Sequence, residues 1–153
     1  MNEDRIKNLI RAWRGKSHNE GDQFASFVFI WFCFNAWFEF LSNKKTDREM
    51  LKELKSKSVI MRSLVDAYDA AFASDEFFKN SLRDLINKSK EEPIRDTRGL
   101  KQSVTIRDEN DFTNIVEAIY RIRCNLFHGG KDADSTRDQV LVKDAAMVLR
   151  QWI

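Results

Sequence analysis

The segment from Phe24 to Leu41 constrains the fold more than any other part of the chain. Fifteen of its 18 residues are apolar and seven are phenylalanine; only Ser26, Asn35 and Glu39 interrupt it. A helix that is apolar on every side is surrounded by protein or lipid. A membrane span needs roughly 20 apolar residues with few or no charges, and Glu39 would be costly inside a bilayer. We therefore expect a buried central helix, on which other helices of this chain or of a partner chain pack.

The rest of the chain has apolar residues at the three- and four-residue spacing of amphipathic helices. Because there are only 5 Gly and 1 Pro and no Asn-Gly or Asp-Gly pair, we predict an all-α fold. The expected architecture is an up-and-down bundle of about five to seven helices in a single domain, residues 1–153. The expected helices are Asn2–Trp13, Glu20 or Asp22 to Leu41, Thr46–Lys55, Val59–Phe72, one following Ser74, Asp111–Phe127 and Arg137–Ile153. The expected connections are a polar break at Gly15–Gly21, a linker at Ser42–Lys45 and a loop at Glu91–Gln102, which a short extended piece at Ser103–Ile106 follows.

Local signals place several helix ends. Thr46-Asp-Arg-Glu49 has the spacing of a capping box. Ser74 and Asp111 are expected to cap the helices that follow them. The glycines at 129 and 130 are expected to end the penultimate helix in the left-handed region of backbone space.

The net charge and the cysteines indicate which binding partners and which cellular location to expect. The formal net charge is only +2, so any nucleic-acid binding would depend on local patches rather than on a global field. Cys33 and Cys124 lie in apolar helical stretches and are expected to be buried and reduced, although a disulfide between them stays open. The charged N-terminal segment has no apolar signal core. A cytoplasmic location is therefore expected.

The candidate chemistry lies near the end of the penultimate helix. The sequence has no glycine-rich phosphate loop, nucleophile elbow or His/Cys metal cluster, so neither a cofactor nor a metal is expected. Instead, Arg121, Arg123, Asn125 and His128 gather within eight residues. On an ideal helix all but Arg123 lie opposite the apolar stripe, and Arg123 lies at its flank. An imidazole beside guanidinium and amide groups suits phosphate-ester chemistry. Alternatively, these side chains only complement the helix dipole and cap its carbonyls.

The segment from Arg123 to Lys131, Arg-Cys-Asn-Leu-Phe-His-Gly-Gly-Lys, resembles the signature of the HEPN superfamily (higher eukaryotes and prokaryotes nucleotide-binding). In that signature an arginine is followed by four to six residues and then a histidine. Arg123 has the four-residue spacing to His128, and Arg121 has the six-residue spacing. The phrase Trp31-Phe-Cys-Phe-Asn-Ala-Trp37 also resembles the first core helix of the Apea-like branch. The resemblance therefore rests on short motifs in two separated helices.

This resemblance implies a helical bundle that forms homodimers, in which the motif helices of two protomers build a composite cleft. Many members are metal-independent endoribonucleases of toxin–antitoxin or other defence systems, in which a ribose 2′-hydroxyl attacks the adjacent phosphate. By matching positions, His128 would be the acid/base, Arg123 the phosphate contact and Asn125 the polar residue of the motif. Arg121 and Lys131 would be further substrate contacts. The implied partners are a second copy of the chain, RNA, and a cognate antitoxin or other partner protein.

Cys124 departs from the family pattern, because many active members carry a polar residue directly after the arginine. This departure supports the alternative of a non-catalytic HEPN-like module that binds RNA, a nucleotide or a protein. A plain helical interaction domain is the remaining alternative, in which the Arg/His cluster only caps the helix and contributes to a dimer surface.

Asn35 and Glu39 lie four residues apart in the aromatic helix and need polar partners if they are buried. Two interpretations stay open. In the first, they hold the side chain of Arg123 or His128 in place. In the second, they form hydrogen bonds only with each other and with the nearby backbone.

The stretch from Phe78 to Arg107 has eight Lys or Arg against four Asp or Glu. This local excess is centred on Arg95, Arg98 and Lys101. It is interpreted either as a contact surface for RNA phosphates or as a solvated loop.

Overall fold

The computed structural model describes residues 2–42, 46–132 and 134–153. Within these ranges the chain forms seven α-helices, one 3₁₀ turn and no strand. The helices are α1 (Glu3–Asn19), α2 (Gln23–Ser42), α3 (Asp47–Lys55), α4 (Arg62–Ser74), α5 (Glu76–Glu91), α6 (Phe112–Phe127) and α7 (Thr136–Arg150), and the 3₁₀ turn is Val59–Met61. The prediction of an all-α helical bundle is confirmed. The linker predicted at Ser42–Lys45 falls largely outside the described residues.

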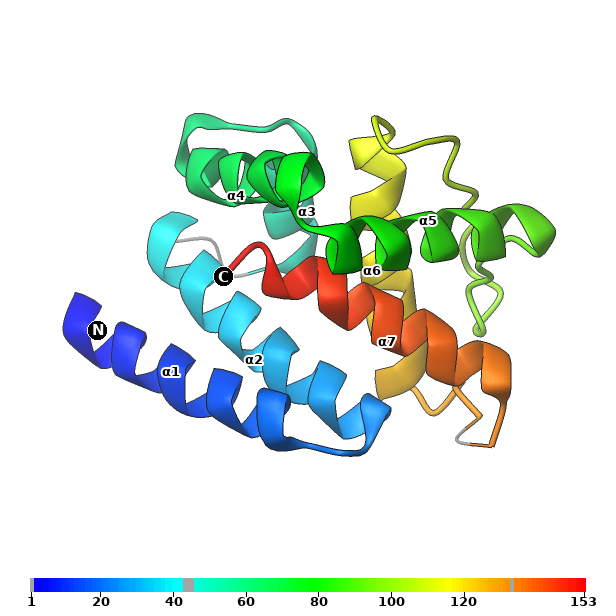
Figure 1. Cartoon of the computed structure of the whole chain (residues 1–153), viewed down its shortest axis with the longest axis horizontal. Coiled ribbons are helices and arrows are strands. Elements are labelled where there is room, and N and C mark those ends of the chain that lie inside the picture. Colours follow the sequence, from blue (N-terminus) through cyan, green and yellow to red (C-terminus); the bar gives the residue numbers. More distant parts are fainter. Residues whose placement is uncertain (1, 43–45, 133) are drawn as a thin grey trace.

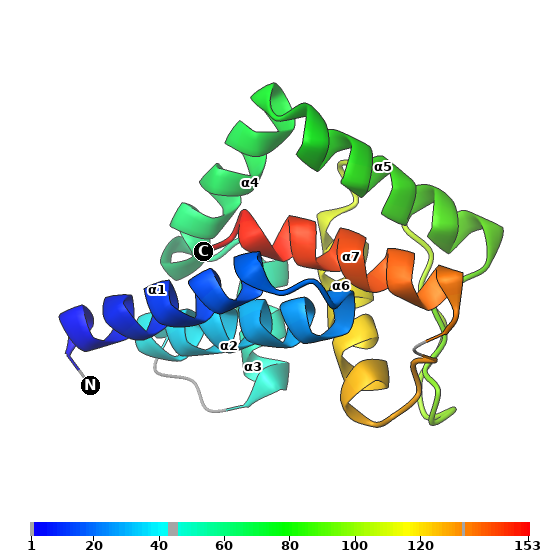
Figure 2. The ribbon, with the colours of Figure 1, turned by 60° about the horizontal axis from the view of Figure 1, so that its bottom comes forward.

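The helices pack around α2 and α7. Helices α1 and α2 form an antiparallel hairpin, and α7 lies against α2 (Figure 1). On its other side α7 packs against α5, which meets α4 at a sharp bend to form a V (Figure 2). Helix α6 crosses behind α7 and also contacts α3 (Figure 1). The core therefore lies between the α1–α2 hairpin and the α4–α5 pair.

The first helix is longer than the sequence predicted. It continues to Asn19, so the polar break expected at Gly15–Gly21 was wrong over most of its length. Its last turn is held by tertiary contacts: the hydroxyls of Ser17 and Ser26 each donate to the other residue's carbonyl oxygen at 2.8 Å. The guanidinium of Arg150 donates to both hydroxyl oxygens, at 3.2 and 2.6 Å. These partners are remote in sequence, so local spacing could not reveal that this turn stays helical.

Helix α2 buries one side and exposes part of the other. Its buried apolar residues are Phe27, Ile30, Trp31, Cys33, Phe34 and Phe38. On the other side, Phe32 is 38% exposed and Glu39 is also exposed. The expected central helix is thus only partly covered by its own chain. By length and composition alone α2 would suffice to cross a membrane, but here its buried side forms the core against α1 and α7.

The predicted helix starts are confirmed in one case and corrected in another. Thr46 Oγ1 accepts from the Glu49 N–H at 3.2 Å, and the Glu49 carboxylate accepts from the Thr46 N–H, so the capping box is confirmed. Ser74 does not cap α5, because its hydroxyl donates to a carbonyl of the preceding turn of α4 at 2.9 Å. Asp75 caps α5 instead, by accepting from the Phe78 N–H at 3.1 Å. A serine hydroxyl at the end of a helix readily donates to a carbonyl of the preceding turn. Ser74 does so here, and the next residue, Asp75, is therefore the one that caps α5.

The segment 92–107 lies against α6 without forming a helix. Ile94 and Val104 exchange two backbone hydrogen bonds of 2.9 Å as an isolated antiparallel bridge, which agrees with the short extended piece expected here. The predicted apolar stripe of α6 faces the core: Phe112, Ile115, Ile119 and Ile122 are buried and Leu126 is partly buried. The core side of α6 was therefore predicted correctly.

The two ends of α6 fall where the sequence placed them. Asp111 precedes the helix, but the prediction that its side chain caps the first turn was wrong. Its carboxylate accepts instead from the Asn114 side chain at 2.8 Å and from the Arg107 N–H at 3.0 Å. Gly129 has a φ of 73°, the left-handed conformation expected after the helix. Gly130 does not share that conformation; a Cβ there would clash with the side chain of Thr97. The second glycine is therefore required by close packing rather than by backbone handedness.

Both cysteines are buried and free, as the sequence predicted. Cys33 Sγ donates to the Ile10 carbonyl oxygen at 3.4 Å, and burial raises the pKa of its thiol to about 11. Cys124 lies on α6 and accepts a hydrogen bond from Arg123 at 3.8 Å. At neutral pH Cys33 is therefore a protonated, unreactive thiol of the core.

Candidate functional site

His128 is the exposed member of the predicted cluster. It ends α6, and its backbone N–H donates to the Cys124 carbonyl oxygen at 3.0 Å. Its side chain is exposed and makes no hydrogen bond or ion pair with the rest of the described chain. Among the described residues, no group of three His, Cys, Asp or Glu side chains is placed to hold a metal ion. The imidazole is therefore accessible to a ligand.

Arg123 is held by a carboxylate and a set of aromatic rings. Its Nη1 lies 3.5 Å from Asp47 Oδ2 at the start of α3, and its side chain is only 18% exposed. The guanidinium carbon lies 4.5 Å from the ring centre of Phe127, 5.5 Å from that of Trp31 and 5.7 Å from that of Tyr120. Cation–π contacts at these distances are attractive. Arg123 therefore sits over Phe127, the residue before His128, but is not paired with His128 itself.

Asp47 is the residue that sequence reasoning missed. It accepts from the Tyr120 hydroxyl at 3.1 Å as well as pairing with Arg123. Burial, with further contributions from neighbouring Cys124 and Asp47, raises the pKa of Tyr120 above its usual range. Tyr120 consequently stays protonated and can keep donating to Asp47. The only sequence signal at Asp47 was its place after the Thr46 cap, which marks a helix start and says nothing about a partner on α6.

Asn35 and Glu39 do not take the supporting position considered for them. Glu39 is exposed, and the carboxylate beside Arg123 is Asp47. The side-chain oxygen of Asn35 is buried and has no hydrogen-bond partner among the described residues. The two residues therefore neither hold Arg123 nor satisfy one another through this oxygen.

Arg121 and Asn125 are buried under the 92–107 segment, with exposed fractions of 4% and 3%. Asn125 Oδ1 accepts from both the N–H and the hydroxyl of Thr97 at 3.1 Å, and Asn125 Nδ2 donates to the Arg95 carbonyl oxygen at 2.7 Å. Arg121 donates to the Gln102 carbonyl oxygen at 2.7 Å. The helical wheel placed both residues away from the apolar stripe, but it could not show that a loop covers this side. Their observed role is to fix that loop.

Lys131 also forms an ion pair within the chain. Its Nζ lies 3.0 Å from Asp138 Oδ1 on α7, and the lysine side chain is only 6% exposed. The same carboxylate accepts from the Asp132 N–H at 2.8 Å. Lys131 thus anchors the loop before α7, and a direct substrate contact would require breaking a largely buried ion pair.

Three cations of the 92–107 segment, Arg95, Arg98 and Lys101, are only partly neutralised by nearby carboxylates. Arg95 pairs loosely with Glu92 at 3.4 Å, and Arg98 lies 3.9 Å from Asp96. Lys101 is exposed and forms no ion pair with the described carboxylates. Of the three cations predicted to contact phosphates, Lys101 is therefore the one without a competing carboxylate.

The comparisons with known proteins give no relative for this chain. No protein-family model matches it, and neither a curated protein nor a solved structure matches it.

We expect Asn125→Ala to loosen the 92–107 segment. The substitution leaves the Thr97 N–H and the Arg95 carbonyl without their partner, and an unsatisfied buried polar group costs about 1–3 kcal/mol. Urea unfolding should show a loss of stability in that range, and trypsin should cut faster at Arg95, Arg98 and Lys101. The exposed Asn87→Ala on α5 is the matched control. Unchanged stability and proteolysis would contradict the anchoring role.

Proposed function

We propose that the chain is a HEPN-type, metal-independent endoribonuclease whose acid/base is His128. The observation that carries the proposal is the exposed, unpaired imidazole at the end of α6, next to Phe127, over whose ring the Arg123 guanidinium lies. An exposed titratable group and a fixed positive charge at the same end of one helix fit phosphodiester cleavage. The resemblance of the segment 123–131 to the HEPN signature supports the same reaction.

In the proposed reaction the ribose 2′-oxygen attacks the adjacent phosphorus and the bond to the 5′-oxygen breaks. A base takes the proton of the 2′-hydroxyl and an acid delivers a proton to the departing 5′-oxygen. The products are a 2′,3′-cyclic phosphate and a 5′-hydroxyl. Arg123, held in place by Asp47, would stabilise the charge that grows on the phosphate oxygens. Asn125 acts as a positioning residue, through the loop it anchors.

The proposal includes a homodimer, because one chain offers a single imidazole here and the reaction uses both a base and an acid. In a composite cleft the two His128 side chains would take these two roles. The family resemblance further supports a place in a toxin or other defence system, a cognate antitoxin or other partner protein, and action in the cytoplasm.

Cleavage of RNA in excess EDTA tests the proposal. Purified protein should cut single-stranded RNA and leave 2′,3′-cyclic phosphate ends, which end-group analysis by mass spectrometry detects. RNA methylated at every 2′-oxygen should not be cut, since it lacks the nucleophile. Cleavage that requires a divalent cation, or equal cleavage of the methylated RNA, would refute this mechanism.

A non-catalytic RNA-binding module is the second candidate. It is favoured by the degree to which the motif side chains are already engaged: Arg123 with Asp47, Asn125 with the loop, and Lys131 with Asp138. Cys124 at the position after Arg123 favours it as well. This candidate predicts salt-sensitive RNA binding without cleavage under any of the conditions above.

A further inference from the structure

A groove lies between α3, α6 and the segment around Lys101. Its first part is a cavity of about 520 Å³, lined on the α3 side by residues that include Arg48, Lys52 and Lys55 and on the α6 side by Glu117 and Tyr120. A second cavity, of about 610 Å³, adjoins it and shares Lys101 and Glu117 as walls. Both volumes lie within the range of about 300–1,000 Å³ that is common for ligand sites.

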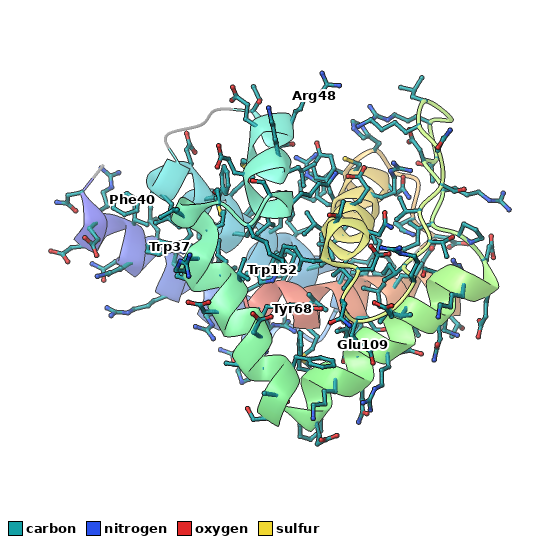
Figure 3. The ribbon with its side chains drawn as sticks, turned by 90° about the horizontal axis from the view of Figure 1, so that it is seen from above. Trp37, Phe40, Arg48, Tyr68, Glu109 and Trp152 are labelled. Atoms are coloured by element: carbon teal, nitrogen blue, oxygen red, sulfur yellow. The ribbon has the colours of Figure 1, made fainter. Side chains whose placement is uncertain are left out.

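The groove carries more positive charge than its own carboxylate can neutralise. Among the described residues that line the groove, Glu117 is the one acidic side chain, and it is already shared between Lys55, in a close ion pair, and Arg121, at 3.5 Å. Arg48, Lys52 and Lys101 are exposed and make no ion pair with the described carboxylates. Arg48 stands at the outer edge of α3 and points away from the core (Figure 3). Three cations are therefore available to an anionic ligand.

The sequence of α3 concentrates charge on the groove side of the helix. Arg48, Lys52 and Lys55 follow a four- and three-residue spacing, which brings like charges together on one side and destabilises a helix. The acidic residues Glu49 and Glu53 do not line the groove. An arrangement that costs stability in the free protein is relieved when an anion occupies the groove.

The aromatic wall distinguishes the kind of anion. Tyr120 lines the first cavity, and its hydroxyl is fixed on Asp47, so its aromatic ring is held in place as part of the wall. Grooves that combine cations along a path with an aromatic surface are typical of single-stranded nucleic-acid sites. The second cavity adds the polar groups of Gln102, Ser103 and Asn114. A phosphodiester strand uses all three features, whereas an acidic peptide uses only the charge.

The groove includes Glu117 and Arg121 of α6, and His128 follows Arg121 by seven residues. The part of α6 between them is covered, because Arg121 and Asn125 are buried under the 92–107 segment. His128 lies two turns beyond Arg121, about 10 Å along the axis. We propose that this groove holds the phosphodiester backbone of a single-stranded RNA that is the substrate of the proposed nuclease. The inference rests on the proposed function for the role of that RNA as a substrate, but not for the binding itself.

Binding of a fluorescent, fully 2′-O-methylated oligouridine tests the groove without cleavage. The charge-reversal pair Arg48→Glu/Lys52→Glu should weaken binding by about 10-fold or more and flatten its dependence on salt. Glutamate at position 48 suits the first turns of α3, so folding should be retained, and circular dichroism checks this. The neutral pair Arg48→Gln/Lys52→Gln should give a smaller loss. Arg5→Glu/Arg11→Glu on the exposed side of α1 changes the net charge equally and should bind as wild type does.

Three results would overturn the inference. The first is equal binding by the groove pair and the wild type. The second is an equal loss in the groove pair and the α1 pair, which indicates non-specific charge effects. The third is a poly-glutamate peptide that binds as tightly as the oligouridine and displaces it. The two proposals can fail separately. If RNA binds through the groove but unmodified RNA is not cleaved, only the nuclease proposal is refuted. If the groove pair of substitutions leaves cleavage unchanged, only the groove proposal is refuted.

Discussion

Replacing His128 by alanine is expected to lower RNA cleavage by about 10²–10⁴-fold, the usual contribution of a positioned general acid or base. The side chain is exposed and makes no contact that holds α6 in place, so the helix content and the unfolding midpoint should stay as in the wild type. A discontinuous assay with end-labelled RNA in EDTA measures the rate, and far-ultraviolet circular dichroism measures the fold.

His18→Ala is the matched control, because His18 is the other histidine of the chain and lies exposed near the end of α1. It should cleave at the wild-type rate. Excess His128→Ala protein mixed into the wild type should also lower cleavage per wild-type chain, since mixed dimers would have one imidazole instead of two. Equal rates for His128→Ala and wild type would refute the catalytic assignment, and an additive mixture would refute the composite site.

The second large effect is expected at Asp144, a carboxyl group of α7 that is only 4% exposed. Burial, together with the hydrogen bond and the charge of nearby Asp84 on α5, raises the pKa of Asp144 to about 9 against the smaller opposing effect of Lys143 and Lys88. Asp144 Oδ2 has no hydrogen-bond partner among the described residues. The folded protein therefore keeps a proton on Asp144 at neutral pH, where the unfolded chain, with an ordinary pKa of about 3.9, does not.

The pH dependence of stability follows from this difference. A group whose pKa is raised by folding contributes its full stability below the unfolded pKa, and the contribution is lost as the pH rises towards the folded pKa. The window here is about pH 4 to about pH 9. Each unit of pH within it costs up to about 1.4 kcal/mol. The protein should accordingly be most stable at the acidic end of this window, as far as Asp144 is concerned.

Asp144→Asn should remove that loss, because the amide fills the same space and can donate a hydrogen bond without titrating. We expect the difference in unfolding free energy between variant and wild type to shift by on the order of 4 kcal/mol in favour of the variant between pH 5 and pH 8. Urea unfolding at both pH values measures it. Asp66→Asn, at an exposed position on α4, is the control. A variant whose stability follows the same pH curve as the wild type would contradict the protonated Asp144.

Several parts of the fold were predictable because their causes are local. The capping box at Thr46 and the left-handed Gly129 depend on residues within four positions of each other. The apolar stripe of α6 follows from helical spacing alone. Two predictions, the break in α1 and the cap at Ser74, were wrong for other reasons. The break does not form because the contacts of Ser17 with Ser26 and Arg150 keep this turn helical. Ser74 is not the cap because the neighbouring aspartate, Asp75, caps α5 instead.

The candidate site divides in a similar way. The sequence singled out Arg121, Arg123, Asn125 and His128 by type and spacing. The structure leaves His128 exposed, pairs Arg123 with Asp47, and covers the other two with a loop. A helical wheel treats each side of a helix as open or buried according to its own residues. It has no means of including a covering segment from elsewhere in the chain.

By itself, therefore, the sequence of this protein determined an all-α chain, most of its helices and the group of polar residues at the end of α6. Those properties depend on hydrophobic period and capping, which act over one or two turns. Only the tertiary structure decided which of those polar residues a ligand can reach. It also decided that α3 brings Arg48 and Lys52 alongside Lys101 and Tyr120 in one groove. Accessibility and shared cavities depend on segments that are far apart in sequence, and no local pattern encodes which of them will meet.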